Sequence, residues 1–383
     1  MLRIGIEAHI LEDKRTGTTA RYLLNILRYI NSLPGAENNF RVFIYSKRPI
    51  KNFDFLSSPV FESKVLTFLG RSSWIAYFGY KLPLQAKKDN VDVMFFPFNM
   101  MAPLTQLRSI MVIHDIDFFR DPKSYSLKYR IVYNLMAKIS VNRAEKIISV
   151  SKFSRKELVK HLGVEPSKVK VVYQGVEEKF EKMDNIAEIK EVKKKYGIND
   201  RYIFSAGLIF TRRHTVEAIK AFGDIVNDFP DVQFLVGGIN ATEPFVDLEK
   251  LSESINNKAG RKAVILAGFI DEQDMVPLYN GCEFSVYISE YEGFGMPVVE
   301  TLRCERPVLA TNMTALKESG GGYQVSVEDP GDISEIAEKM RDILNNPEFY
   351  RNKAKGGAEY VKKNFSWDKA VPEILKLLNK TYK

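Results

Sequence analysis

The sequence predicts an α/β protein made of two doubly wound domains. Short runs rich in β-branched and aromatic residues alternate with segments of helical apolar spacing. This alternation occurs twice, on either side of a polar segment at 177–195 that has no strand pattern. The chain has 383 residues, more than one hydrophobic core usually supports, so two domains of roughly 180 residues are expected.

Six strands are expected in the first half, each a short apolar run. They are 3–7, 41–45, 91–96, 110–114, 146–150 and 169–173. A helix is expected over 17–33, where apolar residues recur at helical spacing. Another should start near Ser154, because Ser154 followed by Glu157 has the form of a capping box.

Six more strands are expected in the second half, with helical patterns between them, notably at 216–229 and 333–344. The strands are 202–206, 232–236, 263–266, 284–288, 308–310 and 324–327. Alternating strands and helices favour a mostly parallel sheet with helices on both faces and right-handed crossovers. The segment 177–195 is the predicted linker between the halves.

Composition indicates a folded protein of the cytoplasm. Hydrophobic residues make up 45% of the chain, yet no run approaches the roughly 20 apolar residues of a membrane-spanning helix. The first residues have the pattern of a strand and not of a signal peptide. Cys282 and Cys304 are the only cysteines, too few for a disulfide framework.

The formal net charge of +8 suits an anionic substrate, an anionic membrane surface or nucleic acid. Nucleic acid is disfavoured, because the chain has no arginine-rich cluster, zinc spacing or recognition-helix motif. The basic and aromatic stretch 71–88, with Trp74, Tyr77, Phe78 and Tyr80, is a candidate membrane contact. The same pattern also fits an amphipathic helix packed on its own sheet.

Two glutamates, Glu292 and Glu300, bracket the most informative segment of the chain. It follows a buried-strand pattern and contains Gly293, Gly295 and Pro297. The glycines permit close approach of a ligand to the main chain, and proline suits the first turn of a helix. That helix would direct free amides at the edge of the sheet, where phosphate binds well. Carboxylates beside such a seat can accept hydrogen bonds from hydroxyls, so the predicted ligand is a nucleotide sugar.

The spacing of these two glutamates resembles the Glu-x₇-Glu signature of retaining glycosyltransferases with the GT-B fold, especially the large family four. Five further blocks resemble that family in its usual order, and together they cover nearly the whole chain. They are Thr16–Gly17, 113–115, 148–155, 171–176 and 202–222, followed by the signature itself within 289–308.

The resemblance implies two Rossmann-like domains facing each other across a cleft. The acceptor-side domain would comprise residues 1–180, and the donor domain residues 181–362. The last helix, 363–383, would pack back on the first domain, as in relatives.

The resemblance also implies roles for individual residues. Arg213 stands where relatives usually carry lysine against the donor diphosphate, and the adjacent Arg212 can exchange roles with it. His114, at a strand end, would lie by the transferred sugar and donate to one of its hydroxyls. Glu300 would bind the ribose and Glu292 the transferred sugar. His114, Arg213 and Glu292 are the expected catalytic residues. The expected donor-binding residues are Gly17, Gly207, Arg212, Arg213, Gly268, Phe269, Glu292, Gly293, Phe294, Gly295, Met296 and Glu300.

The implied activity is metal-independent sugar transfer with retention and without a cofactor. GDP-mannose is the first choice of donor, because three of the blocks look most like mannosyltransferases of surface polysaccharides; UDP- and dTDP-sugars stay open. The acceptor would be a glycan or a lipid-linked glycan at the inner face of the membrane. Alternatives are a catalytically silent nucleotide-sugar-binding protein, a phosphorylase, and a metal site of the Asp-x-Asp type at Asp115 and Asp117.

Overall fold

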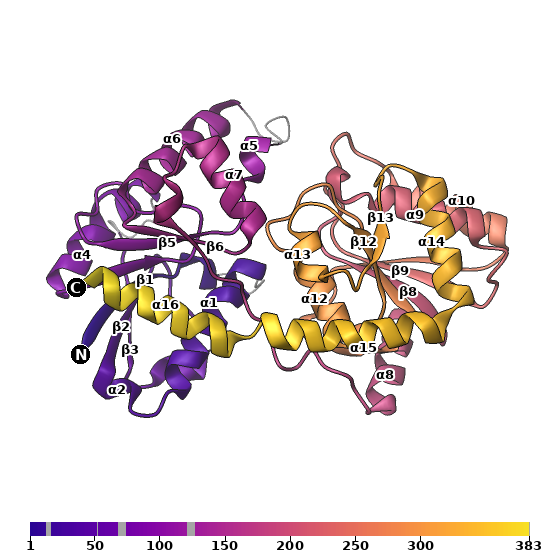
Figure 1. Cartoon of the computed structure of the whole chain (residues 1–383), viewed down its shortest axis with the longest axis horizontal. Helices are drawn as coiled ribbons and strands as arrows, with labels where there is room; N and C mark the ends of the chain where they lie inside the picture. The colour runs from indigo at the N-terminus through magenta and orange to yellow at the C-terminus, as the bar shows by residue number, and fades with distance from the viewer. Residues whose placement is uncertain (13–16, 52, 68–73, 121–126, 383) are drawn as a thin grey trace. The chain divides into compact units, whose positions relative to one another are not determined.

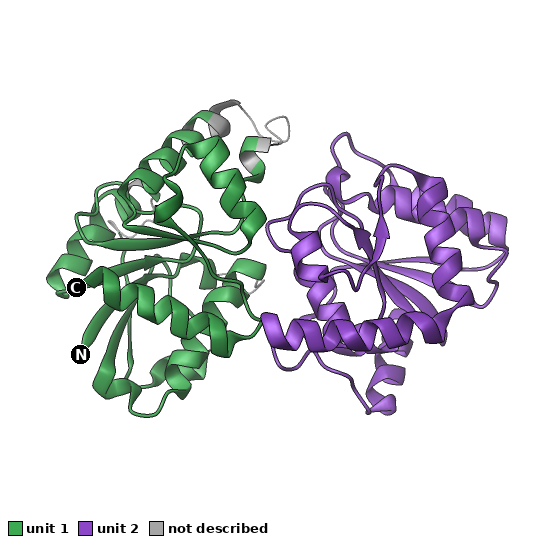
Figure 2. Ribbon diagram, in the orientation of Figure 1, with its two compact units in different colours: residues 1–175, 365–383 green, residues 176–364 purple. Residues whose placement is uncertain are grey.

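The structure, a computed structural model, describes residues 1–12, 17–51, 53–67, 74–120 and 127–382. The chain divides into two compact units (Figure 2). Unit 1 comprises Met1–Gly175 and Phe365–Lys383, and unit 2 comprises Val176–Asn364. These boundaries lie close to the predicted ones, at 180 and 362.

The described residues of unit 1 form a seven-stranded sheet in the order β3-β2-β1-β4-β5-β6-β7 (Figure 1). Every neighbouring pair is parallel. The strands are β1 (Leu2–Glu7), β2 (Phe40–Ser46), β3 (Phe61–Val65), β4 (Val93–Phe96), β5 (Ser109–Ile113), β6 (Lys146–Ser149) and β7 (Val169–Val171).

Helices lie between these strands along the chain of unit 1, and α16 follows unit 2. The α-helices are α1 (Thr18–Ser32), α2 (Ala36–Asn39), α3 (Trp74–Ala76), α4 (Leu82–Lys88), α5 (Asp117–Arg120), α6 (Leu127–Arg143), α7 (Lys152–Leu162) and α16 (Trp367–Tyr382). The shorter helical turns are η1 (His9–Leu11), η2 (Asp54–Ser57), the π-helical η3 (Tyr77–Lys81) and η5 (Pro166–Lys168).

The described residues of unit 2 form a six-stranded parallel sheet in the order β10-β9-β8-β11-β12-β13. The strands are β8 (Arg201–Ala206), β9 (Val232–Gly237), β10 (Val264–Gly268), β11 (Phe284–Tyr287), β12 (Val308–Thr311) and β13 (Val325–Val327). The helices are α8 (Ile186–Tyr196), η6 (Thr211–Arg213), α9 (Thr215–Ile225), α10 (Leu248–Ala259), α11 (Glu272–Gly281), α12 (Met296–Arg303), α13 (Leu316–Gly320), α14 (Ile333–Asn345) and α15 (Pro347–Asn364).

One core face of unit 2 shows how the strands are held. Phe222 of α9 meets Phe234 of β9 edge-on, with ring centres 5.7 Å apart. Both belong to a continuous cluster of buried side chains that includes Ile203 of β8 and Met340 of α14. Burying an aromatic or branched side chain of this kind contributes about 1.5–3 kcal/mol, so strand and helix hold each other.

The twelve predicted strands are all present, but the sequence analysis missed β3. Its residues Phe61–Val65 include three consecutive polar residues, 62–64, and form the edge of the sheet, where the strand has one neighbour, β2. Short polar edge strands resist pairing with other chains, and for that reason they carry a weak apolar pattern.

The predicted linker at 177–195 is wrong over most of its length, because it contains α8. Asn185 caps this helix with its side chain, and Gly197 ends it in the left-handed conformation. The helix packs on α11, where the Tyr196 hydroxyl donates to Asp274 at 2.7 Å. The predicted capping box is also wrong. Ser151, not Ser154, is the cap of α7, and its side chain accepts from the Ser154 amide.

The described residues of the stretch 71–88, from 74 onward, include both buried and exposed side chains. Tyr77 and Phe78 are buried, while Trp74 and Tyr80 are exposed. The Tyr77 hydroxyl donates to the carbonyl of Tyr45 on β2, so this segment packs on its own sheet. Within the described residues, no helix is both long and apolar enough to cross a bilayer.

The last helix, α16, packs within unit 1, near α1 and strands β4 and β5. At its far end Arg108 donates to the carbonyl of Thr381 at 2.7 Å. At its start, Trp367 lies directly against Gly175. A Cβ added to Gly175 would lie 2.6 Å from Cγ of the Trp367 ring, a distance that real Cβ atoms do not show.

We therefore expect Gly175→Ala to destabilise unit 1 by about 1–3 kcal/mol, because overpacking forces Trp367 or the backbone to shift. The matched control is Gly79→Ala in the same unit, where an added Cβ meets nothing within 4 Å. Urea unfolding followed by tryptophan fluorescence measures this unit, since Trp74 and Trp367 are the only tryptophans. Equal midpoints for the two variants would contradict the expected clash.

Candidate active site

The candidate site lies at the edge of the unit 2 sheet where the strand order reverses. The sheet continues in opposite directions from β8 and β11, which are neighbours. In open parallel sheets, ligands bind outside the carboxyl ends of the strands at such a reversal. Gly207 and η6 follow β8, and Glu292 follows β11, so both loops lie at this edge.

Arg213 and Glu292 form a two-pronged ion pair. Arg213 Nε donates to Glu292 Oε1 at 2.8 Å, and Nη2 donates to Oε2 at 3.3 Å. The remaining Nη1 donates to the carbonyl of Leu208 at 3.0 Å. The guanidinium is therefore held in a fixed plane, with cation and carboxylate side by side.

Tyr287 at the end of β11 and Ser289 just after it contact this pair. The Arg213 guanidinium lies 5.3 Å from the ring centre of Tyr287, whose hydroxyl bonds to Glu292. The Ser289 hydroxyl donates to Glu292 Oε1 at 3.2 Å. Burial alone would raise the pKa of Glu292, but the charge and hydrogen bonds of Arg213 outweigh it, so the pKa lies below its ordinary value. Glu292 is therefore ionised at neutral pH.

Gly207 explains how the arginine reaches this position. Its φ of +125° is open to glycine and closed to most other residues, and an added Cβ would lie 3.1 Å from Arg213 Nη1. The guanidinium of the neighbouring Arg212 lies 4.4 Å from the ring centre of Phe210, and that of Arg213 lies 5.6 Å from the same ring. Both charges lower the pKa of Glu292, and Arg213 donates the two hydrogen bonds to it.

The segment between the two glutamates has the predicted form of a turn leading into a helix. Gly295 has a φ of +95° and is the N-cap of α12, which begins at Met296 with Pro297 in its first turn. Gly293 and Phe294 are buried in the turn before it. Pro297 has no amide hydrogen and the Val298 amide donates to the Gly295 carbonyl at 3.1 Å. The positive end of the helix dipole still favours an anion here.

Glu300 occupies the second turn of α12 and is only 2% exposed. The Tyr279 hydroxyl of α11 donates to its Oε2 at 3.4 Å. The carboxylate thus faces the packing between α11 and α12, and a ribose would have to reach a mostly covered group. Gly268 ends β10 with a φ of +63°, and the adjacent Phe269 is 56% exposed. Phe269 therefore offers an open aromatic ring at the same edge of the sheet.

The unit 1 residues expected to serve the reaction are His114 and Gly17. His114 follows β5; its amide donates to Asn99, and its ring Nε2 lies 3.0 Å from the carbonyl of Pro97. Because a carbonyl only accepts, Nε2 carries the hydrogen and Nδ1 is the acceptor of the neutral ring. The predicted donation to a sugar hydroxyl therefore does not fit the neutral ring. Gly17 is the N-cap of α1, and a Cβ added there would meet no described residue within 4 Å.

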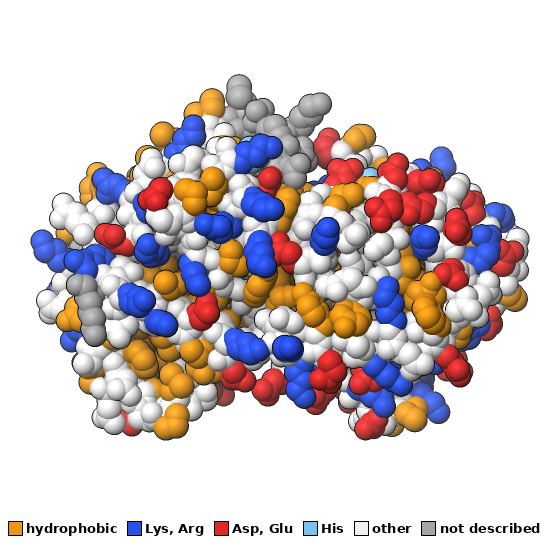
Figure 3. All heavy atoms as spheres, viewed as in Figure 1, with side chains coloured by type: hydrophobic (Ala, Val, Ile, Leu, Met, Phe, Trp, Pro, Cys, Tyr) orange, Lys and Arg blue, Asp and Glu red, His pale blue; other side chains and the backbone are white. Residues whose placement is uncertain are grey.

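No group of three or more His, Cys, Asp or Glu side chains with metal-binding geometry occurs in the described part of the chain, which includes Asp115 and Asp117. The Asp117 amide lies 3.4 Å from the Asp115 carboxylate, as in a tight turn. On the face shown in Figure 3, Lys and Arg side chains are interspersed with Asp and Glu over much of the surface.

Sequence reasoning missed the residues that orient the ion pair. Tyr287 and Ser289 stand at the end of a predicted strand next to the signature, a position that could have marked them. His214 was also missed. It has a positive φ of 43° and bonds to Glu290 at 2.8 Å, which holds the loop after β8 to the loop after β11. No sequence pattern reveals that pairing.

Two family models cover nearly the whole chain. The model described as Glycosyltransferase Family 4 matches residues 20–180, and the model described as Glycosyl transferases group 1 matches residues 188–360. The chain belongs to this glycosyltransferase family. The predicted membership is confirmed.

Several relatives of this family 4 glycosyltransferase are mannosyltransferases of Escherichia coli. The serotype-specific mannosyltransferase WbdA is 29% identical over 68% of this chain, but the match spans only 32% of that protein, about a third of its length. The O-antigen chain mannosyltransferase B is 25% identical, and the match covers 76% of this chain and 75% of that protein.

Solved structures confirm the predicted fold. The Anabaena protein Alr3699/HepE, solved in complex with UDP and glucose, has a TM-score of 0.75 at 16% identity and covers 99% of this chain. WaaG, a glycosyltransferase involved in lipopolysaccharide biosynthesis, has a TM-score of 0.73 at 15% identity and covers 98%. Both match over nearly their full length, so the chain has the GT-B topology of two parallel-sheet domains.

The surroundings of His114 predict a pH dependence of stability. Burial lowers the pKa of His114 to about 4, so the unfolded chain takes up this proton first as pH falls. The contribution of His114 to the free energy of unfolding is fully present above pH 6.5 and is lost as the pH falls toward 4. At 1.36 kcal/mol per pKa unit, this loss is at most about 3 kcal/mol. Urea unfolding of His114→Gln should show a smaller loss between these pH values than the parent chain. Parallel losses would contradict this assignment.

Proposed function

We propose that the protein transfers a sugar from a nucleoside diphosphate sugar to a hydroxyl of an acceptor, with retention of the anomeric configuration. The observation that carries the proposal is the Arg213–Glu292 pair at the strand-order reversal of unit 2. A cation and a carboxylate held side by side match a ligand in which a phosphate adjoins a polyol.

The donor would bind along this edge of the sheet. Arg213 and the N-terminal end of α12, at Gly295 and Met296, would hold the diphosphate. Glu292 would accept hydrogen bonds from hydroxyls of the transferred sugar. The backbone N–H groups of Gly293 and Phe294 would donate to its oxygens. Arg212 would add positive charge nearby. Phe269, with Gly268 beside it, would stack on the base, and Glu300 would bind the ribose.

The reaction breaks the bond between the anomeric carbon and the β-phosphate oxygen, and the electron pair leaves with the nucleoside diphosphate. The acceptor oxygen forms the new bond to the same carbon on the same face. Its proton passes to the departing phosphate oxygen, so no side chain must act as nucleophile. Arg213 would stabilise the charge on that oxygen, a contribution of about 3 kcal/mol for one preorganised donor.

In unit 1, the start of α1 after Gly17 is the place we propose for a phosphate oxygen. No described residue lies within 4 Å of a Cβ added at Gly17. His114 Nδ1 would accept a hydrogen bond from a hydroxyl of the transferred sugar.

The mannosyltransferase relatives favour mannose, and GDP-mannose is the donor we propose first; the UDP in HepE keeps UDP-sugars as the next choice. The proposed acceptor is a glycan or lipid-linked glycan of a surface polysaccharide, met in the cytoplasm at the inner face of the membrane.

A panel of nucleotide sugars tests the proposed function. A donor that binds the folded chain raises its melting temperature by mass action. GDP-mannose should give a larger shift than GDP alone, and release of nucleoside diphosphate should accelerate with an acceptor glycan. Binding without any release or transfer would favour a catalytically silent nucleotide-sugar-binding protein.

Arg213→Ala should lower kcat/KM by about 10²-fold, because the developing phosphate charge loses its fixed partner. The matched control is Arg341→Ala in the same unit, which removes an exposed ion pair with Asp228. The control should transfer sugar at the parental rate. A loss of similar size in both variants would refute the role of Arg213.

Chelation of divalent metal ions should leave transfer largely intact, because Arg213 and the N-terminal end of α12 supply the positive charge. The measurement is initial rate with and without EDTA, followed by addition of Mg²⁺ or Mn²⁺. Complete loss that either ion restores would contradict this expectation and revive the metal hypothesis at Asp115 and Asp117.

A further inference from the structure

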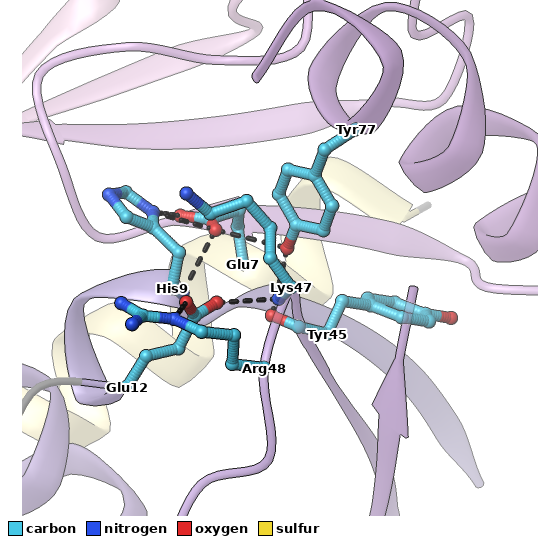
Figure 4. Close-up of polar contacts among 7 residues, drawn as sticks. All are labelled: Glu7, His9, Glu12, Tyr45, Lys47, Arg48 and Tyr77. Carbon is cyan, nitrogen blue, oxygen red and sulfur yellow. Dashed lines mark hydrogen bonds and ion pairs between the residues drawn. The ribbon is translucent and has the colours of Figure 1, made fainter. Parts of the chain in front are cut away.

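A second group of polar and aromatic side chains gathers at the carboxyl ends of β1 and β2 in unit 1 (Figure 4). We call it the β1-end cluster, and its members are Glu7, His9, Lys47, Trp74 and Tyr77. Glu7 is buried and accepts hydrogen bonds from the His9 amide at 3.0 Å and from His9 Nδ1 at 2.8 Å. The Tyr77 hydroxyl lies 3.1 Å from the same carboxylate and shares its one hydrogen between Glu7 and the Tyr45 carbonyl. None of these residues takes part in the site of unit 2.

Glu7 sets the orientation and tautomer of the His9 ring. Because Nδ1 donates to the carboxylate, Nε2 is the hydrogen-bond acceptor of the neutral ring. Figure 4 shows Nε2 pointing away from Glu7. The side chain is 14% exposed, so part of it is accessible. A hydroxyl can therefore donate to a nitrogen whose position is fixed in advance.

An aromatic wall lies beside this nitrogen. The Trp74 ring centre is 4.9 Å from that of His9, and Trp74 stacks on Phe78 at 4.5 Å. Trp74 is nevertheless 42% exposed. The Lys47 ammonium lies 4.8 Å from the centre of the same ring. The cluster thus offers an apolar surface, one fixed acceptor and one ammonium donor, which together suit the C–H groups and hydroxyls of a pyranose.

The charges around the cluster favour an uncharged ligand. Glu12 accepts from Arg48 Nε at 3.0 Å and from the Lys47 amide at 2.5 Å. Among the described residues, two carboxylates, Glu7 and Glu12, thus stand beside two cations, Lys47 and Arg48. A neutral sugar needs no further cation from the described residues, whereas a phosphate or carboxylate would need one to offset its lost hydration.

The cluster occupies the point in unit 1 that corresponds to the donor site in unit 2. The strand order of unit 1 reverses between β1 and β4. Glu7 ends β1, and Phe98 follows β4 with its ring centre 5.9 Å from that of His9. This is where an open parallel sheet binds its ligand.

We propose that the β1-end cluster binds a neutral pyranose unit of the acceptor glycan, with His9 as the residue that positions a hydroxyl. The assignment of this sugar to the acceptor rests on the proposed transferase function. The proposal that a saccharide binds at the β1-end cluster is independent of that function.

Trp74 fluorescence tests the binding directly in the full-length chain. A Trp367→Phe background leaves Trp74 as the single tryptophan. Titration with methyl α-mannoside and an α-linked mannotriose should change Trp74 emission. His9→Leu should weaken that binding about tenfold through loss of one hydrogen bond, with the melting temperature checked for folding. Tyr80→Ala is the matched control, since Tyr80 is 60% exposed on η3 but belongs to no part of the cluster.

Three outcomes would overturn the inference. They are no response of Trp74 to either saccharide, equal affinity in His9→Leu, or equal loss in Tyr80→Ala. A response of Trp74 to phosphatidylglycerol vesicles but not to saccharides would assign the surface to a membrane instead.

A transfer assay separates this inference from the proposed function. In an active enzyme, His9→Leu should raise KM for the acceptor about tenfold and leave KM for the donor unchanged. An unchanged acceptor KM refutes the subsite alone. Saccharide binding without any donor turnover refutes the transferase function and supports the subsite.

Discussion

The direction of the strands is the constraint on which both sites depend. Every described neighbouring pair in the two sheets is parallel, so all carboxyl ends within a sheet lie on one edge. Each sheet also extends in both directions from a central pair, β1 and β4 in unit 1 and β8 and β11 in unit 2. The loops that leave those pairs diverge, because their crossover helices cover opposite faces. Polar side chains can therefore lie between these loops, outside the apolar core of the sheet.

Much of the fold follows from local sequence, because parallel strands buried on both faces are continuous apolar runs. Twelve strands were predicted from such runs, and every one is present. The failures share a cause. β3 lies at an edge and α8 on the surface of unit 2, so each buries one side only and carries many polar residues. For α8, Asn185 and Gly197 marked the ends of the helix, but the charged residues between them concealed its apolar stripe.

The candidate site was predictable in its location and only partly in its contacts. The spacing of Glu292 and Glu300 placed one carboxylate before α12 and one within it, as the structure has them. It did not reveal that Glu292 bonds to Arg213, a partner 79 positions earlier. Such pairing depends on the order of strands, which no short pattern encodes. For the same reason, local sequence could not predict that Tyr279 of α11 bonds to Glu300. Nor could it predict that His114 Nε2 donates to the Pro97 carbonyl.

The ion pair means that the guanidinium of Arg213 already has a counter-ion when no ligand is bound. In the proposed function, a phosphate bound to Arg213 would have to share the guanidinium with Glu292, whose negative charge repels it. A ligand that also carries hydroxyls would offer hydrogen-bond donors to that carboxylate. The pair would therefore favour a sugar joined to a phosphate over a free anion.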